Sequence, residues 1–248
     1  MPSKAFVLFL LVGAAGCRSA ATTSRPAATT PAPPPATRTS ADPDSIRWVR
    51  DAAEYRAAVL QIYRDATARV ESAARARTAG TWAVVLDADE TVLNNATYQL
   101  ERARQGLAFT PDSWAAWVRR REATPVPGAA AFLDRVHALG GRIAIVTNRL
   151  QSECPDTIAV FELHRLVYDA MLCRLDGTPS DKNPRFEAVA AGRTPTGTTP
   201  LEIVAFVGDN ILDFPKLTQA LKAGGDTAFA DFGVRYFLIP NPMYGSWQ

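Results

Sequence analysis

The stretch VVLDADETVLNN, residues 84–95, begins with apolar residues and then places three acidic residues within four positions. These acids are Asp87, Asp89 and Glu90. Carboxylates so close together raise one another's pKa and cost stability unless a positive group lies among them. The apolar run therefore predicts a buried strand, and the acids predict that a positive charge is bound at its end.

Short apolar runs recur along the chain, and patterns typical of amphipathic helices, such as 129–139 and 156–165, lie between them. Nearly continuous apolar strands that alternate with helices indicate a parallel sheet with helices on both faces. We therefore expect an α/β fold, with the reactive groups at the carboxyl ends of the strands. The predicted strands are 82–86, 142–146, 167–172, 203–207 and 235–239.

Two segments stand outside this alternation. Apolar residues spaced three and four apart between Trp48 and Val70 predict one helix over about 44–76, whose aromatic side chains should pack in the core. The segment of about 96–125 is rich in aromatic residues and interrupts the strand–helix rhythm. We expect it to be a helical insertion that covers the site.

The N-terminal residues have the layout of a secretory signal: Lys4, an apolar stretch over 5–12, and then small residues. This apolar stretch is too short to span a bilayer as a helix. The segment that ends at Cys17 resembles the lipobox of bacterial lipoproteins, although Ala14 stands where leucine is commonest. Cleavage after Ala21 without lipidation is the alternative, and both alternatives predict export. Arg18 after Cys17 favours an outer-membrane destination.

The composition bounds the remaining organisation. Residues 17–43 are rich in alanine, threonine and proline and nearly free of large apolar groups, which predicts a disordered tether between a signal segment (1–16) and a folded domain (44–248). Hydrophobic residues make up 47% of the 248 and charged residues 21%, as in soluble globular proteins. The net charge of +2, without clusters of basic residues, gives no indication of nucleic-acid binding.

Polar and charged side chains follow most of the predicted strands. Asp87 and Asp89 end the first strand and, two residues apart, point to the same side of an extended backbone. Since the carboxyl ends of parallel strands meet at one edge of a sheet, these groups should converge with those that follow the later strands. The later groups are Thr147, Asn148 and Arg149, then Lys182 and Arg185 in a loop, and finally Asp209 and Asp213.

This set of motifs resembles a known superfamily. DADET at 87–91 is similar to the D-x-D-x-T signature of haloacid-dehalogenase-like (HAD) proteins, and Thr147, Lys182 and GDNILD at 208–213 match its other three motifs in order. The longer strings VVLDADETVLNNATY, IVTNR and LIPNPMYGSW resemble class C acid phosphatases, the bacterial outer-membrane lipoprotein acid phosphatases. The resemblance covers nearly all of 44–248. It implies a HAD-like, Rossmann-like sheet with a small helical cap.

The resemblance implies a role for each residue. Asp87 is the expected nucleophile, and Asp89 the expected general acid and base, with its backbone carbonyl also a metal ligand. Lys182, Thr147 and Asn148 should bind the phosphoryl oxygens. Carboxylates clustered with a phosphate are the ligands that Mg²⁺ prefers, so one Mg²⁺ per chain, held by Asp87, Asp89 and Asp209, is the predicted positive charge among the acids. Asp213 should orient Lys182 or the waters on the metal, and it can also cap the helix that follows.

Several residues keep more than one interpretation. Glu90 is expected to be a solvated or capping acid. Asn148, Arg149 and Arg185 match positions of the family, but their roles can equally be structural. Cys154 and Cys173 can pair in an oxidising compartment or remain as two buried thiols, and the sequence does not decide between them.

Other mechanisms of phosphate chemistry lack candidate residues. No C-x₅-R motif follows a cysteine, no Walker loop or G-x-S-x-G motif occurs, and His137 and His164 lie in helical patterns. Carboxylate chemistry therefore remains.

The predicted function is an exported, Mg²⁺-dependent acid phosphatase that hydrolyses small phosphate monoesters, in particular 5′-nucleotides. An aromatic side chain at the mouth of the site could stack on a base, and the candidates are Tyr98, Trp114 and Tyr244. A non-enzymatic lipoprotein that binds nucleotide or metal, and a phosphotransferase that uses the same aspartate, are the alternatives.

Overall fold

The computed structural model of the protein describes residues 42–197 and 199–248. The expected signal segment (1–16), Cys17 and the tether up to residue 41 lie outside the described residues. None of the helices in the described residues has both the length and the apolar character needed to cross a bilayer.

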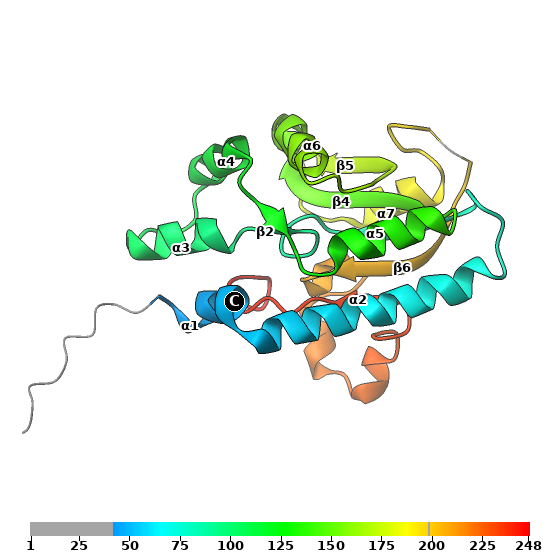
Figure 1. Cartoon of the computed structure of the whole chain (residues 1–248), viewed down its shortest axis with the longest axis horizontal. Helices are drawn as coiled ribbons and strands as arrows, with labels where there is room; N and C mark the ends of the chain where they lie inside the picture. The colour runs from blue at the N-terminus through cyan, green and yellow to red at the C-terminus, as the bar shows by residue number, and fades with distance from the viewer. Residues whose placement is uncertain (1–41, 198) are drawn as a thin grey trace, which may run out of the picture. The chain divides into compact units, whose positions relative to one another are not determined.

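A five-stranded parallel sheet forms the centre of the fold, in the order β5-β4-β1-β6-β7 (Figure 1). It confirms the predicted α/β class. The chain extends from β1 to β4 and β5 on one side, and then returns to β6 and β7 on the other. Such a reversal opens a crevice at the carboxyl ends of the strands beside β1. The strands are β1 (Trp82–Leu86), β4 (Arg142–Leu150), β5 (Ala170–Arg174), β6 (Glu202–Gly208) and β7 (Tyr236–Leu238).

Both faces of the sheet are covered, which explains why β1 is apolar at every position. Trp82, Val84 and Leu86 pack into one core with α2 and α5, which lie along the same face in Figure 1. Ala83 and Val85 face a second core that includes side chains of α7. The helices concerned are α2 (Ala53–Ala74), α5 (Ala129–Ala138), α6 (Cys154–Leu163) and α7 (Asn183–Ala190).

The prediction of one helix over 44–76 is wrong. The chain forms α1 (Asp44–Asp51) and α2, separated by Ala52, whose backbone is extended at φ −83° and ψ 131°. Trp48 and Tyr55 pack edge to face across the break, with ring centroids 5.3 Å apart. Alanine favours helices, so the residue at the break gives no sequence signal for it. The contact of Trp48 with Tyr55 forms only in the folded chain, and the spacing of apolar residues does not predict it.

The segment between β1 and α5 contains two helices, α3 (Ala96–Arg104) and α4 (Pro111–Arg120), beside a short antiparallel pair, β2 (Leu93–Asn94) and β3 (Thr124–Pro125). Thr110 caps α4 by accepting a hydrogen bond from the backbone N–H of Ser113, at 3.2 Å. We call residues 96–125 the cap. The remaining helices are the 3₁₀ turns η1 (Gln151–Glu153), η2 (Ile211–Asp213), η3 (Gln219–Ala223) and η4 (Asp226–Phe229).

Cys154 and Cys173 form a disulfide with a Cα–Cα distance of 6.1 Å. It joins the first residue of α6 to β5, the strand at the edge of the sheet. The structure therefore decides the question that the sequence left open in favour of pairing.

Reduction of this disulfide should lower the free energy of unfolding by about 3 kcal/mol, because it closes a loop of 19 residues in the unfolded chain. Urea unfolding with and without dithiothreitol measures the difference. The double variant Cys154→Ser, Cys173→Ser is the control, and its transition should not respond to the reductant. Identical transitions of the parent protein in both buffers would show that the bond does not stabilise the fold.

Candidate active site

A cavity of about 490 Å³ lies at the carboxyl ends of β1, β4 and β6. Asp87 continues β1, and its backbone N–H bonds to the carbonyl of Val207 at 3.0 Å. The chain then turns sharply, so that the N–H groups of Val92 and Leu93 both bond to the carbonyl of Ala88. The predicted residues that line the cavity are Asp87, Asp89, Trp114, Asn148, Arg149, Lys182, Asp209, Asp213 and Tyr244.

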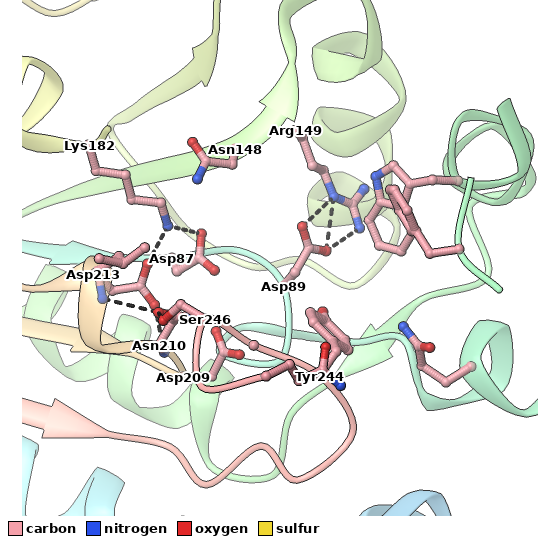
Figure 2. Close-up of a pocket in the computed structure, with 16 residues that line it drawn as sticks. Asp87, Asp89, Asn148, Arg149, Lys182, Asp209, Asn210, Asp213, Tyr244 and Ser246 are labelled. Atoms are coloured by element: carbon pink, nitrogen blue, oxygen red, sulfur yellow. Dashed lines mark hydrogen bonds and ion pairs between the residues drawn. The ribbon is translucent and has the colours of Figure 1, made fainter. Parts of the chain in front are cut away.

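Lys182 joins two of these carboxylates (Figure 2). Its ammonium donates to Asp87 Oδ1 at 2.5 Å and to Asp213 Oδ1 at 2.6 Å. The lysine side chain is only 4% exposed. Burial by itself lowers the pKa of Lys182, but Asp213 and Asp87 raise this pKa above its ordinary value, so the ammonium stays charged. The expected contact of Asp213 with Lys182 is thus present.

Asp87, Asp209 and Asp213 each place a carboxylate oxygen within 4.8 Å of the other two. Burial raises the pKa of Asp87 to about 7, with a further increase from Asp213 and Asp89 and a decrease from Lys182. Burial, followed by the charges of Asp213 and Asp87, likewise raises the pKa of Asp209 well above its usual range. A divalent cation would offset this repulsion, and carboxylate oxygens are its preferred ligands. The three residues therefore fit a metal.

The side chain of Asp213, expected to orient Lys182 or the waters on the metal, lies close enough to the other two carboxylates to be a ligand itself. The side chain of Asp89 does not belong to this group, and its expected metal role is that of its backbone carbonyl. Asp89 instead bonds to the guanidinium of Arg149, at 2.8 Å from Nη2 and 3.0 Å from Nε to Oδ1. Only the backbone carbonyl of Asp89 remains for the metal role that the resemblance implies. The positive group beside Asp89 is an arginine.

Of the two expectations for Glu90, a solvated acid or a capping acid, the first is wrong, whereas the bond it accepts at the N-cap of α3, Asn95, agrees with the second. Its residue is 2% exposed and its backbone is left-handed, with φ at 51°. The carboxylate accepts hydrogen bonds from the backbone N–H of Asn95, at 2.8 Å, and from the hydroxyl of Tyr244. Burial, together with the charge of Asp89, raises the pKa of Glu90 well above its usual value. The sharp turn after Asp89 places Glu90 inside the protein.

The end of β4 is held by Arg185. Its guanidinium donates to the carbonyl of Thr147 and, at 2.6 Å, to the side-chain oxygen of Asn148. Asn148 lines the cavity, whereas Thr147 is fully buried and its hydroxyl accepts from the backbone N–H of Arg149 at 3.1 Å. Of these two predicted phosphate-binding residues, only Asn148 lies at the cavity surface.

The aromatic residues of the cap divide into two groups. Trp114 lines the cavity, but Tyr98 lies outside the lining, is 2% exposed, and bonds through its hydroxyl to Ser113 at 2.8 Å. Tyr98 packs edge to face on Trp114 with ring centroids 5.2 Å apart, so it supports that ring. Phe109, which the sequence did not single out, lines the cavity and is 60% exposed. Phe109 directly precedes Thr110, the N-cap of α4, and an aromatic residue at the start of a cap helix is a sequence signal that could have marked it as a cavity residue.

The C-terminal segment completes the cavity through Tyr244, Gly245, Ser246 and Gln248. Three side chains attach it to the site. Tyr244 bonds to Glu90, Ser246 donates to Asn210 at 2.7 Å, and Asn241 donates to Asp209 at 2.8 Å. Asn241, Gly245 and Ser246 entered the sequence prediction only within the string LIPNPMYGSW, and Gln248 did not enter it. No pattern of residue spacing predicts that this segment lies at the ends of the strands.

Comparison with known proteins agrees with this geometry. A family model described as "HAD superfamily, subfamily IIIB (Acid phosphatase)" matches residues 11–247. Two solved structures of the class C acid phosphatase from Bacillus anthracis are similar to the chain, and each match covers 82% of this chain and 84% of the other. The one with tungstate bound has 29% identity and a TM-score of 0.70, and the other has 30% and 0.71. The chain therefore belongs to the HAD subfamily IIIB acid phosphatases, related to those of class C, and is a phosphomonoesterase.

Proposed function

We propose that the protein is an exported, Mg²⁺-dependent phosphatase that hydrolyses small phosphate monoesters, in particular 5′-nucleotides, through phosphorylation of Asp87. The observation that carries this proposal is the contact of one buried ammonium, that of Lys182, with both Asp87 and Asp213 inside the cavity. A fixed cation beside a carboxylate suits a site in which that carboxylate attacks a phosphoryl group.

Asp87 is the proposed nucleophile. Lys182 bonds to Oδ1 of Asp87, which leaves Oδ2 for attack on phosphorus. As the new bond between Oδ2 and phosphorus forms, the bond from phosphorus to the ester oxygen breaks, and its electron pair stays on that oxygen. Asp89 gives the leaving oxygen a proton and later takes one from the water that releases phosphate and restores Asp87.

Asp87, Asp209 and Asp213 would hold the metal through their carboxylates, together with the backbone carbonyl of Asp89 that the resemblance implies. When bound, Mg²⁺ supplies positive charge to the carboxylates and to the oxygens of the phosphoryl group. The relative with bound tungstate supports a site for a tetrahedral oxyanion, which is the shape of phosphate. Asn148 and Lys182 line the same cavity and are the proposed protein donors to the phosphoryl oxygens.

The leaving group is proposed to be small and aromatic. Three aromatic side chains, Phe109, Trp114 and Tyr244, line the cavity together with the carboxylates. An aromatic ring stacked on one of them would gain about 0.5–1.5 kcal/mol beyond its burial. A nucleotide base is such a ring, and a 5′-phosphate would extend from it to Asp87.

Export is supported by the disulfide, because such bonds persist in oxidising compartments outside the cytosol. This agrees with the proposed signal segment and with the proposed lipid anchor on Cys17.

The variant Asp87→Asn should lose turnover of p-nitrophenyl phosphate by about 10⁴-fold or more, since an amide cannot replace the nucleophile. Release of inorganic phosphate measures the loss, and thermal unfolding reports whether the fold is intact. The control Asp226→Asn changes an exposed acid in η4 and should behave as the parent. Substantial turnover by a folded Asp87→Asn protein would mean that another group attacks phosphorus.

Chelation of metals should abolish turnover, and added Mg²⁺ should restore it. In Asp209→Asn the Mg²⁺ concentration needed for half of the maximal rate should rise by at least about tenfold, because one ligand becomes neutral. The same titration of Asp226→Asn should match the parent. Full activity in the presence of a chelator would contradict the metal site.

The variant Cys17→Ala, expressed with its N-terminal segment in a bacterial host, should move from the membrane fraction to the soluble exported fraction, since the acyl chains that hold the protein on the bilayer are missing. Cell fractionation and the intact mass of the mature chain measure this. A parent protein that is already soluble, with the mass expected for cleavage after Ala21, would show simple secretion.

A further inference from the structure

The carboxylate of Asp89 is held by hydrogen bonds from two side chains, those of Arg149 and Asn95, both of which contact the cap. Its Oδ1 accepts three hydrogen bonds, at 3.0 Å from Arg149 Nε, 2.8 Å from Arg149 Nη2 and 2.9 Å from Asn95 Nδ2. Its Oδ2 has one longer contact, at 3.2 Å from Arg149 Nε. The donors are thus centred on Oδ1, and Oδ2 is the oxygen that remains for a proton.

Arg149 connects this carboxylate to the cap. The residue is 2% exposed, and its Nη1 donates to the hydroxyl of Thr157 at 3.2 Å. Its guanidinium carbon lies 5.4 Å from the centre of the ring of Trp114, which belongs to α4. Figure 2 shows the arginine reaching Asp89 from the end of β4. A planar guanidinium with fixed partners on several sides has one orientation.

Asn95 makes a second connection to α4. It is fully buried, and while its Nδ2 donates to Asp89, its Oδ1 accepts from the indole N–H of Trp117 at 2.9 Å and from Arg149 Nη2 at 3.4 Å. Trp117 and Arg149 donate to the amide oxygen and Asp89 accepts from the amide nitrogen, so a flipped side-chain amide would lose these bonds. Trp117 therefore sets the direction in which Asn95 presents its N–H group to Asp89.

We propose that Arg149 and Asn95 are positioning residues that aim Oδ2 of Asp89 at the leaving oxygen, and that Trp114 and Trp117 of α4 fix their geometry. The proposal rests on the role of Asp89 as the proton donor. In that step the proton passes from Asp89 to the ester oxygen while this oxygen keeps the electron pair of its broken bond to phosphorus. Such a transfer works only within hydrogen-bond reach, and a displacement of about 1 Å can cost about 100-fold in rate.

The experiment compares substituted phenyl phosphates, from p-nitrophenyl to p-methoxyphenyl phosphate. A nitrophenolate leaves readily without a proton, whereas a methoxyphenolate needs one, so a misplaced acid harms the second substrate more. The measured quantity is kcat/KM, which covers every step through departure of the phenol. Trp117→Phe keeps an aromatic ring and loses the N–H that binds Asn95. Arg149→Lys keeps the charge and loses the two-pronged contact.

In both variants kcat/KM for p-methoxyphenyl phosphate should fall by roughly 10- to 100-fold, and that for p-nitrophenyl phosphate by less than about threefold. Arg120→Lys is the matched control. The Arg120 guanidinium also stacks on Trp117, at 4.8 Å, but its ion pairs are with Glu101 and Glu122 at the surface. This control should keep the parent's dependence on the leaving group.

Asp89→Asn separates failure of this inference from failure of the proposed mechanism. One result would overturn the positioning role: kcat/KM depends steeply on the leaving group in Asp89→Asn, but Trp117→Phe and Arg149→Lys either keep the parent's dependence or lose activity equally on all substrates. A structural defect slows all substrates alike, so an equal loss would not indicate a misplaced acid. If kcat/KM of Asp89→Asn depends only weakly on the leaving group, Asp89 is not the general acid, and the inference fails together with that role. Where Arg149→Lys does not fold, Trp117→Phe alone decides.

Discussion

The ammonium of Lys182 binds two carboxylates at 2.5 and 2.6 Å, and the three side chains are between 4% and 11% exposed. Loss of one member of a buried ion pair costs about 3–5 kcal/mol, because a charge is then left without a partner. The contact joins the end of β1, the residue before α7 and the turn η2 after β6. These parts are distant in sequence, so the proposed nucleophile, Asp87, is in place only when both faces of the sheet have packed.

The acids of the opening stretch do not share one positive partner. Asp87 lies with Lys182 and the proposed metal, Asp89 with Arg149, and Glu90 with the amide of Asn95 and the hydroxyl of Tyr244. Separate partners give Asp87 and Asp89, the two carboxylates proposed to be catalytic, different environments, although they are two residues apart. A pair of carboxylates with different environments is suited to different tasks, one as a nucleophile and the other as a proton donor.

The sequence predicts the sheet and most of the site because parallel strands bring their carboxyl ends together, as Asp87, Asp209 and Asp213 show. It fails where a tertiary contact decides. Which aromatic residue of a cap helix faces the cavity depends on the rotation of that helix, so Trp114 was identified and Tyr98 was misplaced. Phe109 lies in the loop between α3 and α4 and was missed. The break at Ala52 and the left-handed turn at Glu90 likewise have no local signal, since alanine favours helices and glutamate rarely adopts positive φ.

The twelve residues 84–95 contain the end of strand β1, the two aspartates proposed to be catalytic, and Asn95, which binds Asp89 and Trp117. The turn after Asp89 brings the chain back so that Asn95 lies beside the residue six positions before it. The cap begins at the next residue, Ala96, and α4 returns to the same point through Trp117. A displacement of α4 must therefore break the bond between Trp117 and Asn95 or move Asn95 with it. Trp114 lines the cavity and packs on Arg149, so a substrate that contacts Trp114 would act on the same unit that holds Asp89, the proposed proton donor.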